Sequence, residues 1–307
     1  MSVARLEAEA AEFYRTQSPV SDPGRYADLY AALPDGPAAL AEVVRGLIIH
    51  RVEGPLFEYE IAEERLHDDA ETRYIDDILG LLLQRDARPL TSPRRLEDRF
   101  VGTCRDFALL LCSFLRAKGV PARIRSGFAN YFGDDPETYG DHVVTEYWDL
   151  ERGWLLADAQ IVDGCHGTGL DPLDVPRDRF LVAGRAWQAI RAGHRDPERF
   201  GLFSPDLTLA GCWFVAGNIR LDLSSLNKVE TLLWDLWGTG ADVEGDGDMT
   251  DEIYELYDLA ARVADDEVEF AAARSLFADN AGLRTPATVL SAAQYNGPRE
   301  VLLRSCS

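Results

Sequence analysis

The amino-acid sequence predicts an α+β fold, in which one apolar helix is followed by an antiparallel sheet and helical additions flank both. An uninterrupted apolar stripe with helical spacing indicates the helix within residues 103–118. Three segments with the composition of strands follow, at 122–129, 142–148 and 154–160. The stretch 149–153 supplies a hairpin loop between the last two. Because such short connections join antiparallel strands, we expect an antiparallel sheet.

Helical patterns dominate both flanks of this core. Residues 1–90 indicate mainly helices, and apolar residues between 75 and 83 recur with the spacing of a core-facing helix. We expect an N-terminal helical region packed on the core at 1–95, the core at 96–165 and a C-terminal helical region at 166–307. The candidate helices of the C-terminal region are 179–192, 221–236, 251–264 and 267–277.

The ends of the core helix are marked by local signals. Thr103 is a favourable N-cap residue, and Asp106 three positions later resembles the partner of a capping box, with Asp in place of Glu. Gly119 and then Pro121 end the helix, since glycine suits the position after the last turn and proline cannot continue it. We therefore expect Cys104 to lie in the first turn.

The charge balance and the cysteines exclude several classes of protein. A total of 53 Asp and Glu against 31 Lys and Arg gives a net charge of −22, which repels nucleic-acid phosphates and anionic membranes. The first residues are charged and lack the apolar segment of a signal peptide, and no apolar run approaches the roughly 18 residues of a membrane span. We therefore expect an acidic, cytoplasmic protein without nucleic-acid or membrane partners. Five scattered cysteines without a CxxC pair are expected to be free thiols: Cys104, Cys112, Cys165, Cys212 and Cys306.

Cys104 is the strongest candidate for a reactive group. Amide N–H groups and the positive end of the helix dipole favour a thiolate at the start of a helix. A buried structural cysteine is the usual interpretation of a lone cysteine, and Cys112, well inside the same helix, fits it. Cys104 does not, because its position is one where a nucleophile would be activated.

A thiol nucleophile needs a base and a group that orients the base. Among the five histidines, His142 opens a predicted strand, and Asp158 lies on the next one. If the numbers of paired residues add up to 300 or 302, both side chains lie on one face of the hairpin, whereas a shift by one residue would separate them. The spacing thus allows Cys104, His142 and Asp158 to converge.

Several motifs resemble the transglutaminase-like superfamily of papain-related cysteine enzymes. They are Gly102-Thr103-Cys104-Arg105-Asp106-Phe107-Ala108, the stretches 118–123 and 126–128, Asp141-His142 with the residues up to Asp149, and 153–160. Val143-Val144 and Ala159-Gln160 depart from the Ala-Trp and Pro-Thr that usually follow the histidine and the aspartate. More loosely, 217–238 resembles a bacterial, largely uncharacterised branch of the superfamily.

The resemblance implies a papain/transglutaminase-like catalytic core at 96–165, with Cys104 as nucleophile, His142 as general base and acid, and Asp158 as the residue that orients the imidazole. The implied chemistry is cysteine-dependent acyl transfer or hydrolysis on an amide or thioester. The substrate class stays open among a protein, a peptide, a small molecule and a carrier-bound acyl group. So does the choice between a deamidase or peptidase and an amide-forming acyltransferase. The alternative is a non-catalytic binding or scaffold module that keeps the fold.

The sequence offers no convincing metal or cofactor site. Cys165-His166 stands between glycines, but no second Cys/His pair follows at zinc-finger spacing, and a flexible loop is the better interpretation. The acidic stretch 242–248 resembles the start of a calcium loop, yet its twelfth position is Ile253, where a bidentate glutamate is required. We expect chemistry without a metal or cofactor.

Overall fold

The computed structural model describes residues 5–162, 165–204, 207–293 and 296–304, so the first four residues and Cys306 lie outside the described residues. The fold is α+β, as the sequence predicts. Two short strands of the N-terminal part, β1 (Ile48–His50) and β2 (Phe100–Gly102), pair in parallel. The rest of that part is helical or 3₁₀-helical: α1 (Ala8–Arg15), η1 (Gly24–Ala32), α2 (Pro37–Leu47), η2 (Gly54–Phe57), α3 (Glu63–Asp68), α4 (Ile75–Arg85) and η3 (Leu96–Asp98).

A central sheet contains the three expected strands, β3 (Ala122–Ala129), β4 (Tyr139–Asp149) and β5 (Gly153–Ala157), which pair antiparallel. The sheet extends further on both sides. Strand β6 pairs with β3 at one edge, and β7 followed by β8 lies beyond β4 at the other. Because β7 runs parallel to β4, the sheet is mixed rather than purely antiparallel. The added strands have only three or four residues each, too few to show alternation in the sequence: β6 (Phe180–Val182), β7 (Phe200–Phe203) and β8 (Thr208–Ala210).

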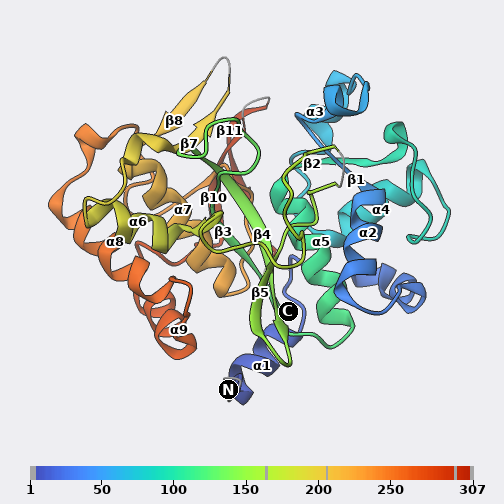
Figure 1. The fold of residues 1–307 in the computed structure, drawn as a ribbon, viewed down its shortest axis with the longest axis horizontal. Coiled ribbons are helices and arrows are strands. Elements are labelled where there is room, and N and C mark those ends of the chain that lie inside the picture. The colour runs from blue at the N-terminus through green and yellow to red at the C-terminus, as the bar shows by residue number, and fades with distance from the viewer. Residues whose placement is uncertain (1–4, 163–164, 205–206, 294–295, 305–307) are drawn as a thin grey trace.

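Helices cover both faces of the central sheet (Figure 1). On one side α5 (Cys104–Ala117) packs against β4 and β3, with α2 and α4 outside it. On the other side α7 (Cys212–Leu226) packs against β3, and α6 (Ala183–Arg191), α8 (Asp251–Val263) and α9 (Phe270–Asp279) surround it. Each side has its own apolar core, so α5 and β3 are buried almost completely.

The expected C-terminal helices are only partly correct. The segments 251–264 and 267–277 correspond to α8 and α9, but the segment 179–192 begins as strand β6 before α6 starts. The expected helix 221–236 is wrong over its second half, because α7 ends at Leu226. Since α7 is buried on nearly all sides, it carries no amphipathic stripe that would mark its true start at Cys212.

A cluster of buried charges joins the central sheet to α7. Arg125 of β3 donates to Asp222 of α7 (Nη2 to Oδ2, 2.9 Å) and to Glu146 of β4 (Nη1 to Oε2, 3.0 Å). Arg123 also donates to Glu146, over 2.7 Å. These pairs satisfy charges that would otherwise be costly to bury. They also explain why β3, with two arginines inside, lacks the alternation of a half-buried strand.

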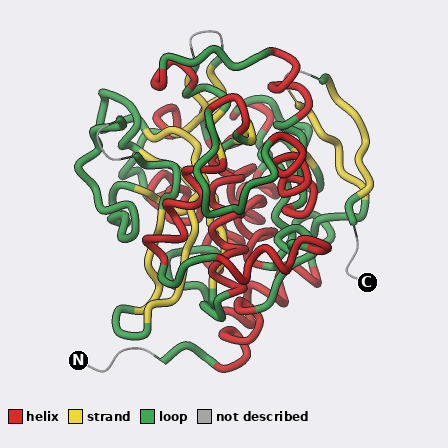
Figure 2. Tube along the Cα trace, turned by 90° about the vertical axis from the view of Figure 1, so that its right-hand side faces the viewer, coloured by secondary structure: helices red, strands yellow, loops and turns green. Residues whose placement is uncertain are grey.

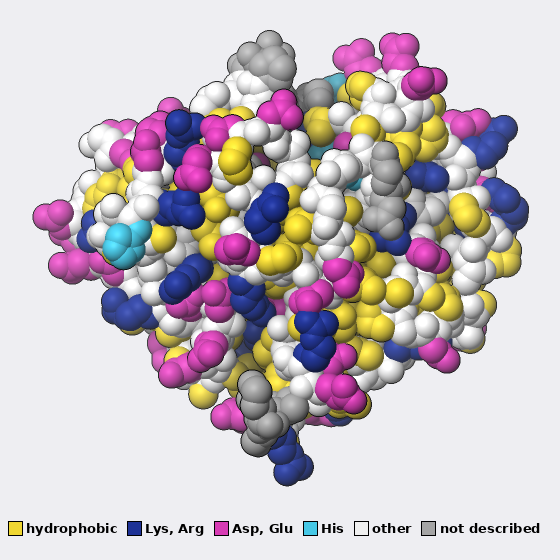
Figure 3. All heavy atoms as spheres, viewed as in Figure 1, with side chains coloured by type: hydrophobic (Ala, Val, Ile, Leu, Met, Phe, Trp, Pro, Cys, Tyr) yellow, Lys and Arg dark blue, Asp and Glu magenta, His cyan; other side chains and the backbone are white. Residues whose placement is uncertain are grey.

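The C-terminal strands form a separate sheet, in which β10 (Thr288–Ala293) pairs with β9 (Asp235–Leu236) and β11 (Gly297–Leu302). Figure 2 shows this hairpin apart from the central sheet, with helices between the two. On the face shown in Figure 3, acidic and basic side chains are interspersed, so the negative net charge does not form one continuous patch there. Among the described residues, no helix has the length and apolar character needed to cross a membrane.

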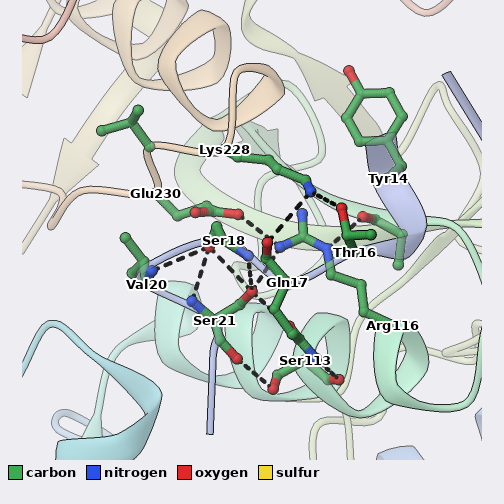
Figure 4. A network of polar contacts seen from close by, with 12 residues as sticks. Tyr14, Thr16, Gln17, Ser18, Val20, Ser21, Ser113, Arg116, Lys228 and Glu230 are labelled. Carbon is green, nitrogen blue, oxygen red and sulfur yellow. Dashed lines mark hydrogen bonds and ion pairs between the residues drawn. The ribbon is translucent and has the colours of Figure 1, made fainter. Parts of the chain in front are cut away.

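The carboxyl-terminal half of α5 is fixed by a network of polar contacts (Figure 4). Arg116 donates to Glu230 (Nη1 to Oε1, 3.0 Å) and to the Ser21 hydroxyl (2.8 Å), with Arg116 and Glu230 both fully buried. Gln17 donates from Nε2 to the Ser113 carbonyl over 2.9 Å. The network ties the segment after α1 and the loop after α7 to the helix that begins with Cys104.

A glycine on β3 permits the close approach of β6. A methyl group at Gly127 would lie 2.1 Å from the Leu181 carbonyl oxygen, which is backbone and cannot yield easily. We expect Gly127→Ala to lower the free energy of unfolding by about 1–3 kcal/mol, as overpacking does. Chemical denaturation measures this loss, and Gly140→Ala on β4 is the matched control, because its nearest new neighbour is 3.9 Å away. Equal stability of the two variants would contradict the expectation.

Candidate active site

Cys104 is the first residue of α5, and the local sequence explains its position. The expected capping box is present: the Thr103 N–H donates to Asp106 Oδ2 over 2.8 Å, which stabilises the start of the helix. Arg105 is buried beside it and donates to Asp106 and to the carbonyls of Arg73 and Glu230. The first turn, and with it the Cys104 thiol, is therefore held from several directions.

The β4–β5 register brings His142 and Asp158 to one side of the sheet. Thr145 pairs with Ala157 and Trp148 with Trp154, so paired numbers add up to 302, one of the two sums that the sequence analysis requires. Asp158 follows directly after β5 and lies diagonally from His142. The two side chains are in hydrogen-bond contact, with His142 Nε2 2.8 Å from Asp158 Oδ2.

The Cys104 thiol lies beside His142 and is among the groups that raise the pKa of its imidazole. Because His142 Nε2 donates to the Asp158 carboxylate, the opposite ring nitrogen, Nδ1, is the one left for the thiol. Burial alone lowers the pKa of His142, but the Asp158 carboxylate and the hydrogen bonds to Asp158 and Cys104 outweigh it and raise the pKa to about 10. The imidazole therefore stays protonated at neutral pH when paired in this way.

Three donors converge on the Asp158 carboxylate. Besides His142, the Tyr131 hydroxyl donates to Oδ2 over 2.8 Å, and the Gln160 backbone N–H donates to Oδ1 over 2.9 Å. Burial raises the pKa of Asp158, but the charge of His142 and these hydrogen bonds reverse the shift and keep it below its usual value. The buried carboxylate is therefore ionised and fully partnered.

A second histidine–carboxylate pair lies beside the first. His166 Nε2 is 2.9 Å from Glu53 Oε1, and the same oxygen accepts from Gln160 Nε2 over 2.6 Å. Gln160 thus links this pair to Asp158 through its backbone N–H. No sequence pattern marks Glu53, and the flexible loop predicted at His166 gave no hint of this pair; Gln160, a departure from the family motif, is the one nearby signal in the sequence.

His50 faces the same region from the end of β1, where it pairs with Gly102. Burial is the largest influence on its pKa, which is lowered to about 4, so its imidazole is neutral at neutral pH. His142 and Asp158 both act on it electrostatically, which places it near the site. No sequence pattern marks this residue, because β1 is only three residues long.

Phe132 is the part of the site that reaches solvent. Its ring lies 5.0 Å from that of His142 and 5.4 Å from that of His166, between centroids, and it is 41% exposed. Cys104, by contrast, is only 5% exposed, and His142 and Asp158 less. The thiol is therefore almost closed to solvent in this structure, and Phe132 lies at the exposed edge of the site.

One hollow of the structure lies away from these residues, and a second, much smaller one borders them. A groove of about 570 Å³ runs between η1, α4 and β11, away from α5. A cavity of about 10 Å³, the size of one water molecule, borders Glu53, Gln160 and Phe107. Within the described ranges, no group of three or more ligating side chains could hold a metal ion.

The raised pKa of His142 has a consequence for stability. In the unfolded chain this histidine loses its proton near pH 6.5, whereas in the folded protein it keeps the proton until about pH 10. The His142–Asp158 pair therefore stabilises the fold most below pH 6.5, and its contribution decreases progressively up to pH 10. We expect the free energy of unfolding to fall less steeply between pH 7 and 10 in Asp158→Asn than in wild type. Denaturant titrations across this range measure it. Cys112, whose burial raises its pKa to about 12, contributes equally to both proteins, so parallel pH curves would contradict the pairing.

Comparison with known proteins agrees with these motifs. Residues 83–159 match the family model of the transglutaminase-like superfamily, a segment that includes Cys104, His142 and Asp158. Among solved structures, the chain is similar to a protein from Cytophaga hutchinsonii named "a Putative Cysteine Protease", with 16% identity and a TM-score of 0.33. The match covers 52% of this chain and 45% of that one, so the chain spans less than half the length of that protein. No curated protein matches. The chain therefore contains a transglutaminase-like domain.

Proposed function

Since residues 83–159 form a transglutaminase-like domain, we propose that the protein catalyses cysteine-dependent acyl transfer or hydrolysis on an amide or thioester. In this proposal Cys104 is the nucleophile, His142 the general base and acid, and Asp158 the residue that orients the imidazole. The observation that carries it is the chain of contacts from the thiol through His142 to Asp158, with the last step at 2.8 Å.

The proposed reaction follows from the protonation states at the site. In this proposal the thiol proton passes to the imidazole, and Cys104 attacks as a thiolate. The thiolate forms a bond to the substrate carbonyl carbon, and the amine or thiol leaves with the proton from His142. Water or an amine then attacks the thioester; His142 takes the proton of the attacking group, and Cys104 is released.

The start of α5 supplies a hydrogen-bond donor for the developing oxyanion. The first amide groups of a helix have no partner inside the helix, and the backbone N–H of Cys104 is among them. An oxyanion formed on a carbonyl attacked by the same residue lies close to this N–H. The buried surroundings exclude water and strengthen such a contact.

A model thioester distinguishes the catalytic proposal from a scaffold role. We expect wild-type protein to release free thiol from a short acyl thioester, and Cys104→Ser to release none above the background. Cys112→Ser, a substitution in the same helix away from its first turn, is the matched control and should keep the activity. If wild type and Cys104→Ser release thiol equally slowly, the scaffold alternative holds.

The same assay separates hydrolysis from amide formation. A hydrolase forms carboxylic acid from the thioester without any amine. An amide-forming acyltransferase stalls after releasing one equivalent of thiol and resumes when a primary amine is added. Product analysis by mass spectrometry with and without the amine therefore assigns the acyl acceptor.

Access to the thiol should depend on Phe132. Because its ring covers one edge of His142 and is itself exposed, removing it opens the site to solvent. We expect Phe132→Ala to speed the modification of Cys104 by a bulky maleimide more than its modification by iodoacetamide. The ratio of the maleimide rate to the iodoacetamide rate should rise about tenfold, which corresponds to a barrier lowered by about 1.4 kcal/mol. Phe203→Ala, which removes a similarly exposed ring on β7, is the control. Equal ratios in both variants would contradict this role.

A further inference from the structure

The Asp158 Oδ2 atom accepts two side-chain hydrogen bonds at once, from His142 and from Tyr131, each 2.8 Å long. We propose that Tyr131 is a positioning residue, which shares this oxygen with His142 and thereby limits how tightly Asp158 holds the imidazole. The inference rests on the proposed function, because the shared oxygen matters only if His142 gives and takes protons during a reaction.

The fold holds Tyr131 in place by fixing the residue before it. Asn130 follows directly after β3, and its N–H donates to the Arg179 carbonyl over 3.1 Å. Its side chain accepts from Arg179 Nε over 2.7 Å and donates to the Pro136 carbonyl over 2.8 Å. The phenol therefore reaches Asp158 from a backbone that Asn130 anchors to Arg179 and Pro136, and it is itself buried.

Tyr131 acts in this arrangement as a permanent donor. Burial raises the pKa of its phenol well above the ordinary value, and the charge of Asp158 raises it further. The phenol therefore keeps its proton at neutral pH and acts as a hydrogen-bond donor rather than as a base. Among the described residues, the hydrogen-bond partner of its hydroxyl is Asp158. The Tyr131 ring also contacts that of His142, with centroids 5.9 Å apart, but a hydroxyl effect on His142 passes through the carboxylate.

Sharing an acceptor changes the strength of each bond. A carboxylate oxygen that accepts from a single donor concentrates its charge on that donor, whereas two donors divide it. In the proposed reaction His142 must release its proton to the leaving group, and an imidazolium held too tightly releases it slowly. Tyr131 thus favours proton transfer from His142, because it weakens the hydrogen bond between the imidazolium and the Asp158 carboxylate.

Other titratable and charged groups act on these side chains and must stay unchanged in a test. They come from several elements around the site: Cys104 on α5, His50 at the end of β1, Glu53 before η2, Asp141 on β4, His166 after β5 and Arg179 before β6. A Tyr131→Phe substitution alters none of them and removes only the hydroxyl.

The test follows the titration of the His142 imidazole by NMR in wild type and in Tyr131→Phe. The chain has only five histidines, which makes the assignment tractable. We expect the titration midpoint of His142 to rise by about half a pH unit, and the proton shared between His142 and Asp158 to move downfield as that bond strengthens. In the thioester assay we expect kcat to fall on the order of tenfold with little change in KM. A loss of this size corresponds to the removal of one hydrogen bond to a charged group.

A matched control separates positioning from a structural role. Tyr139 is also buried, and its hydroxyl donates to the Asp178 carbonyl over 3.2 Å, away from Asp158. Tyr139→Phe should leave the His142 midpoint unchanged. If the midpoint in Tyr131→Phe is unchanged or falls, the inference is overturned, even if stability decreases.

The two proposals fail in different ways. If wild type does not react with the thioester, the proposed function fails, and with it the catalytic meaning of Tyr131. If wild type reacts but Tyr131→Phe leaves the His142 midpoint and kcat unchanged, only the inference fails.

Discussion

Replacing His142 by alanine should slow the alkylation of Cys104 by iodoacetamide at neutral pH by about 10²- to 10⁴-fold, the usual contribution of a positioned base. Alanine removes both the acceptor of the thiol proton and the positive charge that stabilises the thiolate. Time-resolved alkylation, with the modified residue identified by peptide mapping, measures the rate at each cysteine.

The other cysteines and histidines provide the controls. Cys112 is buried in the same helix and should react slowly in every variant, while Cys165 reports on a thiol that is open to solvent. His194→Ala removes a solvent-exposed histidine and should leave the rate at Cys104 unchanged. If Cys104 reacts equally fast in wild type and His142→Ala, the imidazole does not activate it.

Replacing Glu230 by alanine should lower the free energy of unfolding by about 3–5 kcal/mol, because it leaves the guanidinium of Arg116 buried without an opposite charge. Both side chains of this pair are fully buried, and the remaining partners of Arg116 are neutral: the Ser21 hydroxyl and the Ala122 carbonyl. Chemical denaturation with a two-state fit measures the loss.

Two variants test whether the buried charge is the cause. Arg116→Met combined with Glu230→Leu buries no charge and should recover most of the stability that Glu230→Ala loses. Glu137→Ala breaks an exposed pair with Arg195 and should cost less than about 1 kcal/mol. A double variant as unstable as Glu230→Ala would contradict this account.

The parts of the fold that the sequence predicted are those with local signals. The helix at 104–117 has its cap, its stop and its apolar stripe within one stretch of chain. The strands predicted at 122–129 and 154–160 correspond to β3 and β5, because their turns and composition are also local, although β5 ends at Ala157, before Asp158. The relation of His142 to Asp158 followed from strand periodicity, since only the register had to be assumed.

The parts that the sequence did not predict depend on contacts between distant residues. Glu53 meets His166 across more than 100 positions, and neither residue lies in a pattern that names the other. Tyr131 is separated from Asp158 along the chain by two entire strands, β4 and β5. The start of α7 was missed because Arg220 and Asp222 are buried in polar pairs, so the helix lacks the exposed polar face by which a surface helix is recognised.

The most direct measurement is to trap the acyl intermediate. Wild-type protein is mixed with a short acyl thioester, quenched in acid within seconds and digested, and the acyl group is located by mass spectrometry. We expect it on Cys104 in wild type and on no cysteine in His142→Ala. An acyl group found on Cys165, or none on Cys104 while free thiol is released, would contradict the assignment of Cys104 as the nucleophile.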